Sequence, residues 1–157
     1  MREPKRPVAV STETAGPLFE GTDYPGSFPE RVKGRSKVLL GDAFGLTNFG
    51  VNLTRLKPGT QSALRHFHTA QDEFIYILEG EGVLITDKGE TPLKAGMCAG
   101  FKAGLRDAHH LINRSDKDVV YLEIGDRSEG DEVFYPDDDL HLPADGPYTH
   151  KDGTPWP

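Results

Sequence analysis

The sequence has only one cysteine, Cys98, so no disulfide can form within the chain. Stable disulfides belong to oxidising compartments, and their absence favours a reducing one. The basic residues Arg2, Lys5 and Arg6 are not followed by the apolar region of a signal peptide. No run approaches the roughly 20 apolar residues that a membrane-spanning helix requires. Together these absences predict a cytoplasmic protein.

Positive charge is also scarce. The chain has 18 Lys and Arg residues against 25 Asp and Glu residues, and its formal net charge is -7. Nucleic acids and anionic membranes both attract basic surfaces, so neither is expected as a partner. We expect a small-molecule ligand or substrate instead.

A third absence is the 3.6-residue periodicity of amphipathic helices, and no segment repeats at the period of a solenoid. The chain instead has 18 Gly and 12 Pro residues, about a fifth of its 157 residues, which separate short β-like runs. Short strands at regular spacing are typical of an all-β sandwich or barrel. The predicted strands are Val38–Leu40, Thr47–Leu56, Phe74–Leu78, Gly82–Thr86, Met97–Phe101, Leu111–Ile112 and Val119–Ile124.

The length predicts one domain with additions at both ends. Prolines interrupt residues 1–37, so we expect an N-terminal arm, with short strands around Val8–Val10, that lies on the barrel or on a second subunit. Residues 38–125 should form the barrel. Residues 126–157 should form a C-terminal extension that packs on the barrel through its aromatic side chains. The acidic residues between Asp126 and Asp139 favour a solvated surface.

A group of potential metal ligands begins at His66. Residues two apart in a strand share a face, so His66 and His68 point the same way. Glu73 opens the next predicted strand and can reach the same centre. Two imidazoles and a carboxylate suit a divalent transition metal and leave coordination positions for water or substrate. A third histidine, His109 or its neighbour His110, follows downstream.

The spacing of these residues resembles the two sequence motifs of the cupin superfamily. The first motif is matched by Gly59, His66, His68, Glu73 and Gly80, with one extra residue between Gly59 and His66. The second is matched by Gly96, Lys102, Gly104, His109 and Asn113, with Lys102 in place of a proline and a longer gap between Gly104 and His109.

This resemblance implies a single jelly-roll barrel, also called a double-stranded β-helix. It implies one divalent metal ion (Zn, Fe, Mn, Ni or Co) bound by His66, His68, Glu73 and His109. His109 is preferred because it has the family's spacing to Asn113, with which it shares strand parity; His110 remains the alternative. Asn113 is expected to orient a ligand through a hydrogen bond.

Further segments resemble a subgroup of small bacterial cupins that are uncharacterised or labelled by analogy as sugar-phosphate isomerases. These segments include Leu40-Gly41-Asp42-Ala43, Asp72-Glu73-Phe74-Ile75-Tyr76 and Tyr148-Thr149-His150-Lys151-Asp152-Gly153-Thr154-Pro155.

Two functions are compatible with such a site. The first is a metal-dependent enzyme acting on a sugar, sugar phosphate or organic acid by isomerase, lyase or dioxygenase-type chemistry. The second is a non-catalytic cupin that binds or senses a metabolite. A phosphate group would need basic residues near the barrel mouth, and the candidates are Arg55, Lys57, Arg65, Lys102 and Arg106.

Five other positions lead to three further expectations. Strand alternation places Phe74, Tyr76 and Leu78 outward, where an apolar patch favours a homodimer. Glu123 is either a second carboxylate near the metal or an outward-facing charge, and the latter is the simpler interpretation. Cys98 is interpreted as a small core residue.

Overall fold

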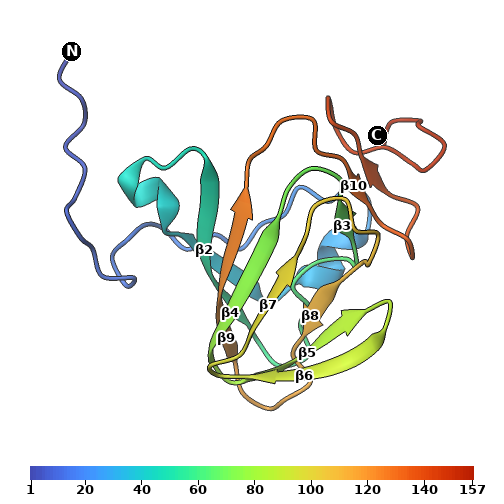
Figure 1. Cartoon of the computed structure of the whole chain (residues 1–157), viewed down its shortest axis with the longest axis horizontal. Helices are drawn as coiled ribbons and strands as arrows, with labels where there is room; N and C mark the ends of the chain where they lie inside the picture. Colours follow the sequence, from blue (N-terminus) through green and yellow to red (C-terminus); the bar gives the residue numbers. More distant parts are fainter.

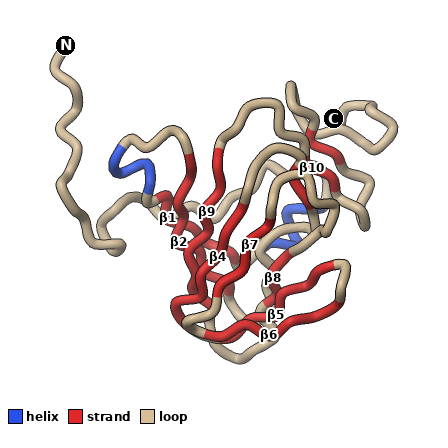
Figure 2. The backbone as a smooth tube through the Cα atoms, in the orientation of Figure 1, coloured by secondary structure: helices blue, strands red, loops and turns tan.

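The computed structural model describes residues 1–157 and consists of short antiparallel strands with two turns of 3-10 helix (Figure 1, Figure 2). The helical turns are η1 (Phe28–Val32) and η2 (Gly41–Phe44). The strands are β1 (Arg35–Leu39), β2 (Phe49–Leu56), β3 (Phe67–His68), β4 (Glu73–Glu79), β5 (Glu81–Thr86), β6 (Gly89–Lys94), β7 (Cys98–Phe101), β8 (His110–Ile112), β9 (Val119–Asp126), β10 (Val133–Phe134) and β11 (His141–Leu142). The chain is therefore all-β, as predicted.

The strands form a jelly roll. One sheet has the order β1-β2-β9-β4-β7, and the two smaller sheets have the orders β6-β5-β8 and β11-β10-β3. All their pairings are antiparallel. Side chains from the large sheet and from β6-β5-β8 meet in one core, so burial of apolar surface holds the two sheets together. The buried members of this core are Leu56, Ile75, Ile77, Leu84, Leu93, Leu111, Val119 and Tyr121.

Strand β4 shows why the sequence pattern predicts this arrangement. Ile75 and Ile77 are buried, whereas Phe74, Tyr76 and Leu78 are exposed on the other face. The alternation has the period of two that a half-buried strand requires. Cys98 lies opposite Tyr76 on the exposed face and is itself exposed. Its interpretation as a core residue was wrong, because the register of β7 turns it outward.

The turn between β4 and β5 depends on Gly80. Its φ of +80° lies in the left-handed region, where residues with a Cβ are strained. A Cβ at this position would also lie 2.3 Å from the backbone oxygen of Asp118. Only glycine fits, so the glycine of the first motif sets the tight connection between the two sheets.

The structure differs from the sequence prediction at the N-terminus. No strand forms around Val8–Val10, and Val8 is fully exposed. The segment extends away from the body of the molecule before Phe19 forms a β-bridge with Lys37 (Figure 1). A few apolar residues between prolines bury too little surface to hold a strand in place.

Strand β6 was also missed. Only Leu93 of its six residues is buried, and the strand contains Pro92. Pro92 is tolerated because β6 is an edge strand of its sheet. With a single buried residue, the strand has no alternation of buried and exposed positions from which it could be predicted. The two-residue strands β3, β10 and β11 are too short to be detected from the sequence.

The C-terminal extension packs beside the barrel through a second apolar cluster. Its buried members are Leu64, Val133, Tyr135 and Leu140, with Tyr24, Phe28, Leu142, Tyr148 and Trp156 packed around them. Strand β10 pairs with β3, so the extension is also hydrogen-bonded to the segment that follows His66. This packing brings Asp131 and Tyr135 of the extension against His68 and His66.

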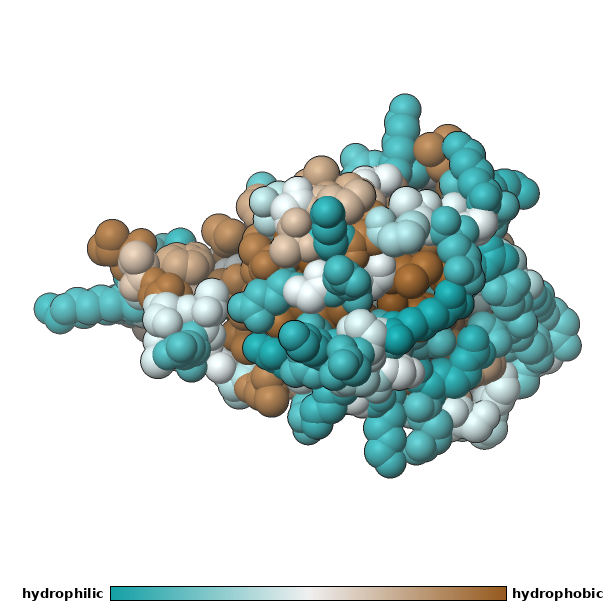
Figure 3. Space-filling model, turned by 90° about the horizontal axis from the view of Figure 1, so that it is seen from below, coloured by the Kyte–Doolittle hydropathy of each residue, from teal (hydrophilic) through white to brown (hydrophobic).

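Apolar side chains also reach the surface. Figure 3 shows brown apolar patches between the polar side chains that cover most of that face. No helix of the chain is long and apolar enough to cross a membrane.

Candidate metal centre

The two histidines and the glutamate of the first motif converge at one end of the barrel. His66 comes just before β3, His68 ends β3, and Glu73 is the first residue of β4. The backbone of His66 forms an antiparallel bridge with that of His109, immediately before β8. Their N–H groups donate to each other's carbonyls at 3.2 and 2.9 Å. This bridge places residues more than forty positions apart side by side.

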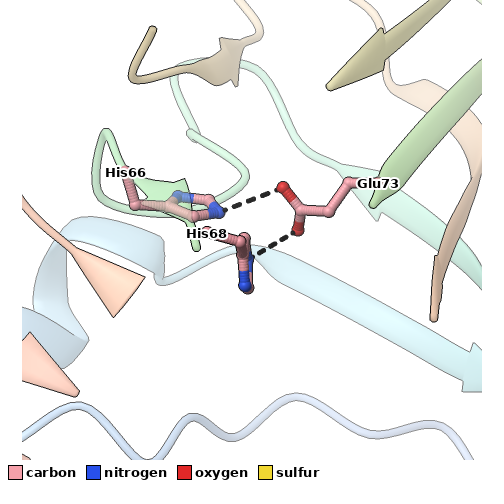
Figure 4. A group of neighbouring side chains, drawn as sticks. All are labelled: His66, His68 and Glu73. Atoms are coloured by element: carbon pink, nitrogen blue, oxygen red, sulfur yellow. Dashed lines mark ion pairs between the residues drawn. The ribbon is translucent and has the colours of Figure 1, made fainter. Parts of the chain in front are cut away.

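The Glu73 carboxylate lies at the centre of the group. His66 Nε2 and His109 Nε2 lie 3.4 and 2.7 Å from Glu73 Oε2, and His68 Nε2 lies 3.1 Å from Glu73 Oε1. Figure 4 shows His66 and His68 directed at Glu73 from the neighbouring segment. The structure therefore brings all four predicted residues together.

Hydrogen bonds on the outer side orient two of the rings. His66 Nδ1 lies 2.7 Å from the Leu64 carbonyl oxygen, and His68 Nδ1 lies 2.6 Å from Asp131 Oδ2. Both partners only accept, so each Nδ1 carries the proton and donates it. In the neutral rings the lone pair is then on Nε2, which is the atom that faces Glu73. This tautomer is the one a metal ligand needs.

The third ring is oriented by packing. His109 stacks on Phe101, with ring centroids 3.5 Å apart and an interplanar angle of 5°. Its Nδ1 is buried and has no hydrogen-bond partner, although the nearby backbone of Asp107 favours its charged form. Burial outweighs that effect and the pull of Glu73, and it lowers the pKa of His109. The imidazole of His109 is consequently uncharged at neutral pH, which is the form that binds a metal ion.

The electrostatics fit a cation at this point. Burial alone would raise the pKa of Glu73, but the surrounding histidines hold it well below its usual range. Burial likewise opposes a charge on His68, yet Glu73 and Asp131 raise its pKa to about 9. When no metal ion is bound, a proton on His68 compensates the negative charge of the Glu73 and Asp131 carboxylates. Three imidazole nitrogens and one anionic oxygen are also the donor set that a divalent transition metal accepts.

Asp131 was missed by sequence reasoning, which placed it in a solvated acidic segment. Its Oδ1 accepts hydrogen bonds from the backbone N–H groups of Ala70 and Gln71 at 2.8 and 3.1 Å, while Oδ2 binds His68. The carboxylate therefore holds both the ring of His68 and the turn before Glu73. Nothing in the local sequence separates Asp131 from its exposed acidic neighbours.

His110, the alternative to His109, and Asn113 of the second motif both lie outside the group around Glu73. His110 Nδ1 binds the Ala63 carbonyl oxygen at 2.9 Å and does not contact Glu73. Asn113 Nδ2 donates to the carbonyl oxygens of Leu56 and Lys117, and its Oδ1 accepts from Ser115. The expectation that Asn113 orients a ligand is wrong, because its amide is used to close the turn before β9.

Glu123 faces inward, contrary to the simpler interpretation. It lines two cavities that also contact His66 and Glu73. Lys37 Nζ lies 2.9 Å from Glu123 Oε1, and Thr54 Oγ1 donates to Glu123 Oε2 at 3.3 Å. The register explains the orientation, since Glu123 shares its face of β9 with the buried Tyr121. Glu123 is therefore a second carboxylate close to the site.

Of the five basic residues considered for phosphate, only Lys102 lines a cavity together with the candidate metal ligands. Arg55 pairs with Asp118, and Arg65 pairs with Asp87 and Asp137. Lys57 and Arg106 are exposed and line neither cavity that contains Glu123. Lys102 lines a small cavity of about 60 Å³ beside His68 and His109.

The fold and the arrangement of donors together define the class of protein. A family model described as "Cupin domain" matches residues 52–125, and the chain belongs to the cupin superfamily. Within it, the chain is 41% identical to a protein of Silicibacter pomeroyi DSS-3 described as a sugar phosphate isomerase from a cupin superfamily. That crystal structure superposes with a TM-score of 0.88 over 95% of this chain and 96% of the other.

Two further relatives are more distant. A protein of Acidithiobacillus ferrooxidans, provisionally assigned as a sugar phosphate isomerase, is 30% identical, with a TM-score of 0.71 over 77% of this chain and 79% of the other. The oxalate-binding protein of Thermotoga maritima is 33% identical over 70 residues, which are 45% of this chain. That match spans only 55% of the Thermotoga protein.

Proposed function

We propose that this protein is a metal-dependent enzyme that acts on a small polar metabolite, with one divalent ion bound by His66, His68, Glu73 and His109. The observation that carries the proposal is the convergence of three Nε2 atoms on the Glu73 carboxylate. Asp131 and the Leu64 carbonyl support it, because they fix the ligating tautomers of His68 and His66.

Isomerisation of a sugar or sugar phosphate is the reaction type that the relatives favour. The Silicibacter protein bears that description and matches nearly the whole chain. A divalent ion in the site would act as a Lewis acid toward a substrate oxygen. We assign proton transfer to Glu123, which lines both cavities that contain His66 and Glu73; its carboxylate would take a proton from one carbon of the substrate and return it to the neighbouring carbon. Lys37 and Thr54 hold that carboxylate in position.

Metal content tests the site. Wild-type protein and the His66→Ala/His68→Ala variant are purified without a histidine tag and compared by elemental analysis. His150→Ala is the control, because that histidine pairs with Asp139 in the C-terminal extension and not with Glu73. We expect bound metal in the wild type and the control and a loss in the site variant. Equal metal content in all three would overturn the proposal.

Turnover separates catalysis from binding. Metal-loaded protein is mixed with a panel of aldose phosphates, and aldose–ketose interconversion is followed by NMR. Glu123→Gln removes the proton acceptor and leaves the four metal ligands in place, so it should keep its metal and lose turnover.

A metabolite-binding protein without catalysis is the second candidate, and the relationship to the oxalate-binding protein favours it. A compound of the panel that binds tightly, with no interconversion in either wild type or Glu123→Gln, would select this candidate.

A further inference from the structure

A chamber lies beside the metal centre, between the N-terminal segment and the large sheet. Its volume is about 330 Å³, within the range of small-ligand sites. Phe19–Tyr24 covers one side, while β1, β2 and β9 supply the wall. His66 and Glu73 also line it, so a molecule in the chamber can reach the metal centre. Phe19, Asp23 and Leu39 are exposed at its rim.

One wall of the chamber carries a buried positive charge, Arg35. It is the only arginine or lysine of the chain in the buried class, with 9% of its surface exposed. Its two terminal nitrogens donate to carbonyl oxygens, of Ser62 at 2.5 Å and of Gly21 at 3.4 Å. Neither partner is an acid. These two bonds are the only hydrogen bonds of the guanidinium group, and Arg35 is one of the residues that line the chamber.

The other charges of the chamber already have partners or are exposed. Lys37 is paired with Glu123, and Glu73 is surrounded by the three histidines. Asp23 is exposed and forms no ion pair within 4.0 Å. Arg35 is therefore the one charge in the chamber that burial penalises and no opposite charge offsets.

An anion in the chamber would provide that missing charge. The guanidinium group presents several N–H donors in one plane and matches the oxygens of a carboxylate or a phosphate. Tyr24, Tyr148 and Thr22, all of which carry a hydroxyl group, are also lining residues. We infer that the chamber binds the anionic oxygen group of a small metabolite, with Arg35 contacting that group while the rest of the molecule extends toward His66 and Glu73. This inference rests on the proposed function, because it gives the substrate of that site a charge.

Anion titrations test the role of Arg35. Oxalate and inorganic phosphate are titrated separately, by calorimetry, into the metal-loaded protein, and erythritol is the uncharged control. We expect one or both anions to bind more tightly than erythritol, and the tighter anion identifies the source as carboxylate or phosphate. Arg35→Met should weaken anion binding by roughly tenfold or more, the effect of one charged hydrogen bond. Arg55→Met, which removes an exposed arginine outside the chamber, should bind as wild type does.

A folded Arg35→Met protein that binds both anions within twofold of wild type would overturn the inference, as would equal binding of erythritol. If Arg35→Met does not fold, Asn52→Asp replaces it. That variant adds a carboxylate to the same wall without touching Arg35 and should weaken anion binding selectively. Unchanged anion affinity in Asn52→Asp would also overturn the inference.

The two proposals can fail separately. Metal content is measured on the same samples, together with His66→Ala/His68→Ala. If the protein binds no metal but still binds anions in a way that depends on Arg35, the metal site is refuted and the anion site stands. If the protein binds metal but its anion affinity does not depend on Arg35, the metal site stands and the anion site is refuted.

Discussion

Replacing Asp131 with asparagine should weaken metal binding, although Asp131 is not one of the four proposed ligands and acts through the outer nitrogen of His68. Its carboxylate accepts three hydrogen bonds, from His68 Nδ1 at 2.6 Å and from the backbone N–H groups of Ala70 and Gln71 at 2.8 and 3.1 Å. An asparagine has one oxygen and one NH₂ group, so it cannot accept all three.

Two orientations of the new amide are possible, and their costs differ. If its oxygen turns to His68, two backbone N–H groups lose their acceptor, at about 1–3 kcal/mol each. If its oxygen stays with the backbone, the NH₂ group faces His68 Nδ1 and drives the ring proton to Nε2, where it blocks ligation. Losing such a partner costs about 10- to 100-fold in affinity, or roughly 1.4–2.8 kcal/mol. The second orientation is cheaper, so we expect that loss.

Competition with a chromophoric chelator measures the affinity. Glu129→Gln is the matched control, because it removes the same charge from the same acidic segment at an exposed position. An Asp131→Asn affinity within threefold of the control would refute the assigned tautomer of His68.

The remaining predictions concern pH, packing and assembly. Burial raises the pKa of Tyr24 to about 12, above its ordinary value near 10. The neutral Tyr24 side chain therefore stabilises the folded state fully below pH 10, and this contribution is lost as the pH rises through about 12. Between these two pH values, the free energy of unfolding should fall less steeply with pH in Tyr24→Phe than in the wild type. Leu64→Ala creates a cavity at a fully buried site and should lower the free energy of urea unfolding by about 2–5 kcal/mol. A decrease of less than about 1 kcal/mol would contradict the packing of the C-terminal extension against Leu64. The exposed Phe74, Tyr76 and Leu78 favour a homodimer, so light scattering should give twice the subunit mass, and Tyr76→Glu should give the monomer. A single subunit mass for the wild type would count against this interface.

The local sequence determined the parts of the site that lie close together in the chain. The period of two in β4 sets Ile75 and Ile77 inside and Tyr76 outside, and the same period puts His66 and His68 on one side of their strand. These relations hold because strand geometry depends on neighbouring residues alone. Turn glycines such as Gly80 mark the strand ends for the same reason.

Only the tertiary structure decided which distant side chains meet. Asp131 looks like its exposed acidic neighbours until β10 pairs with β3 and brings it to His68. Glu123 turns inward because the pairing of β9 with β2 and β4 sets its face, and Arg35 becomes a buried cation only when the N-terminal segment covers β1. Burial and partner charge depend on packing between segments far apart in the chain, and no local pattern encodes them.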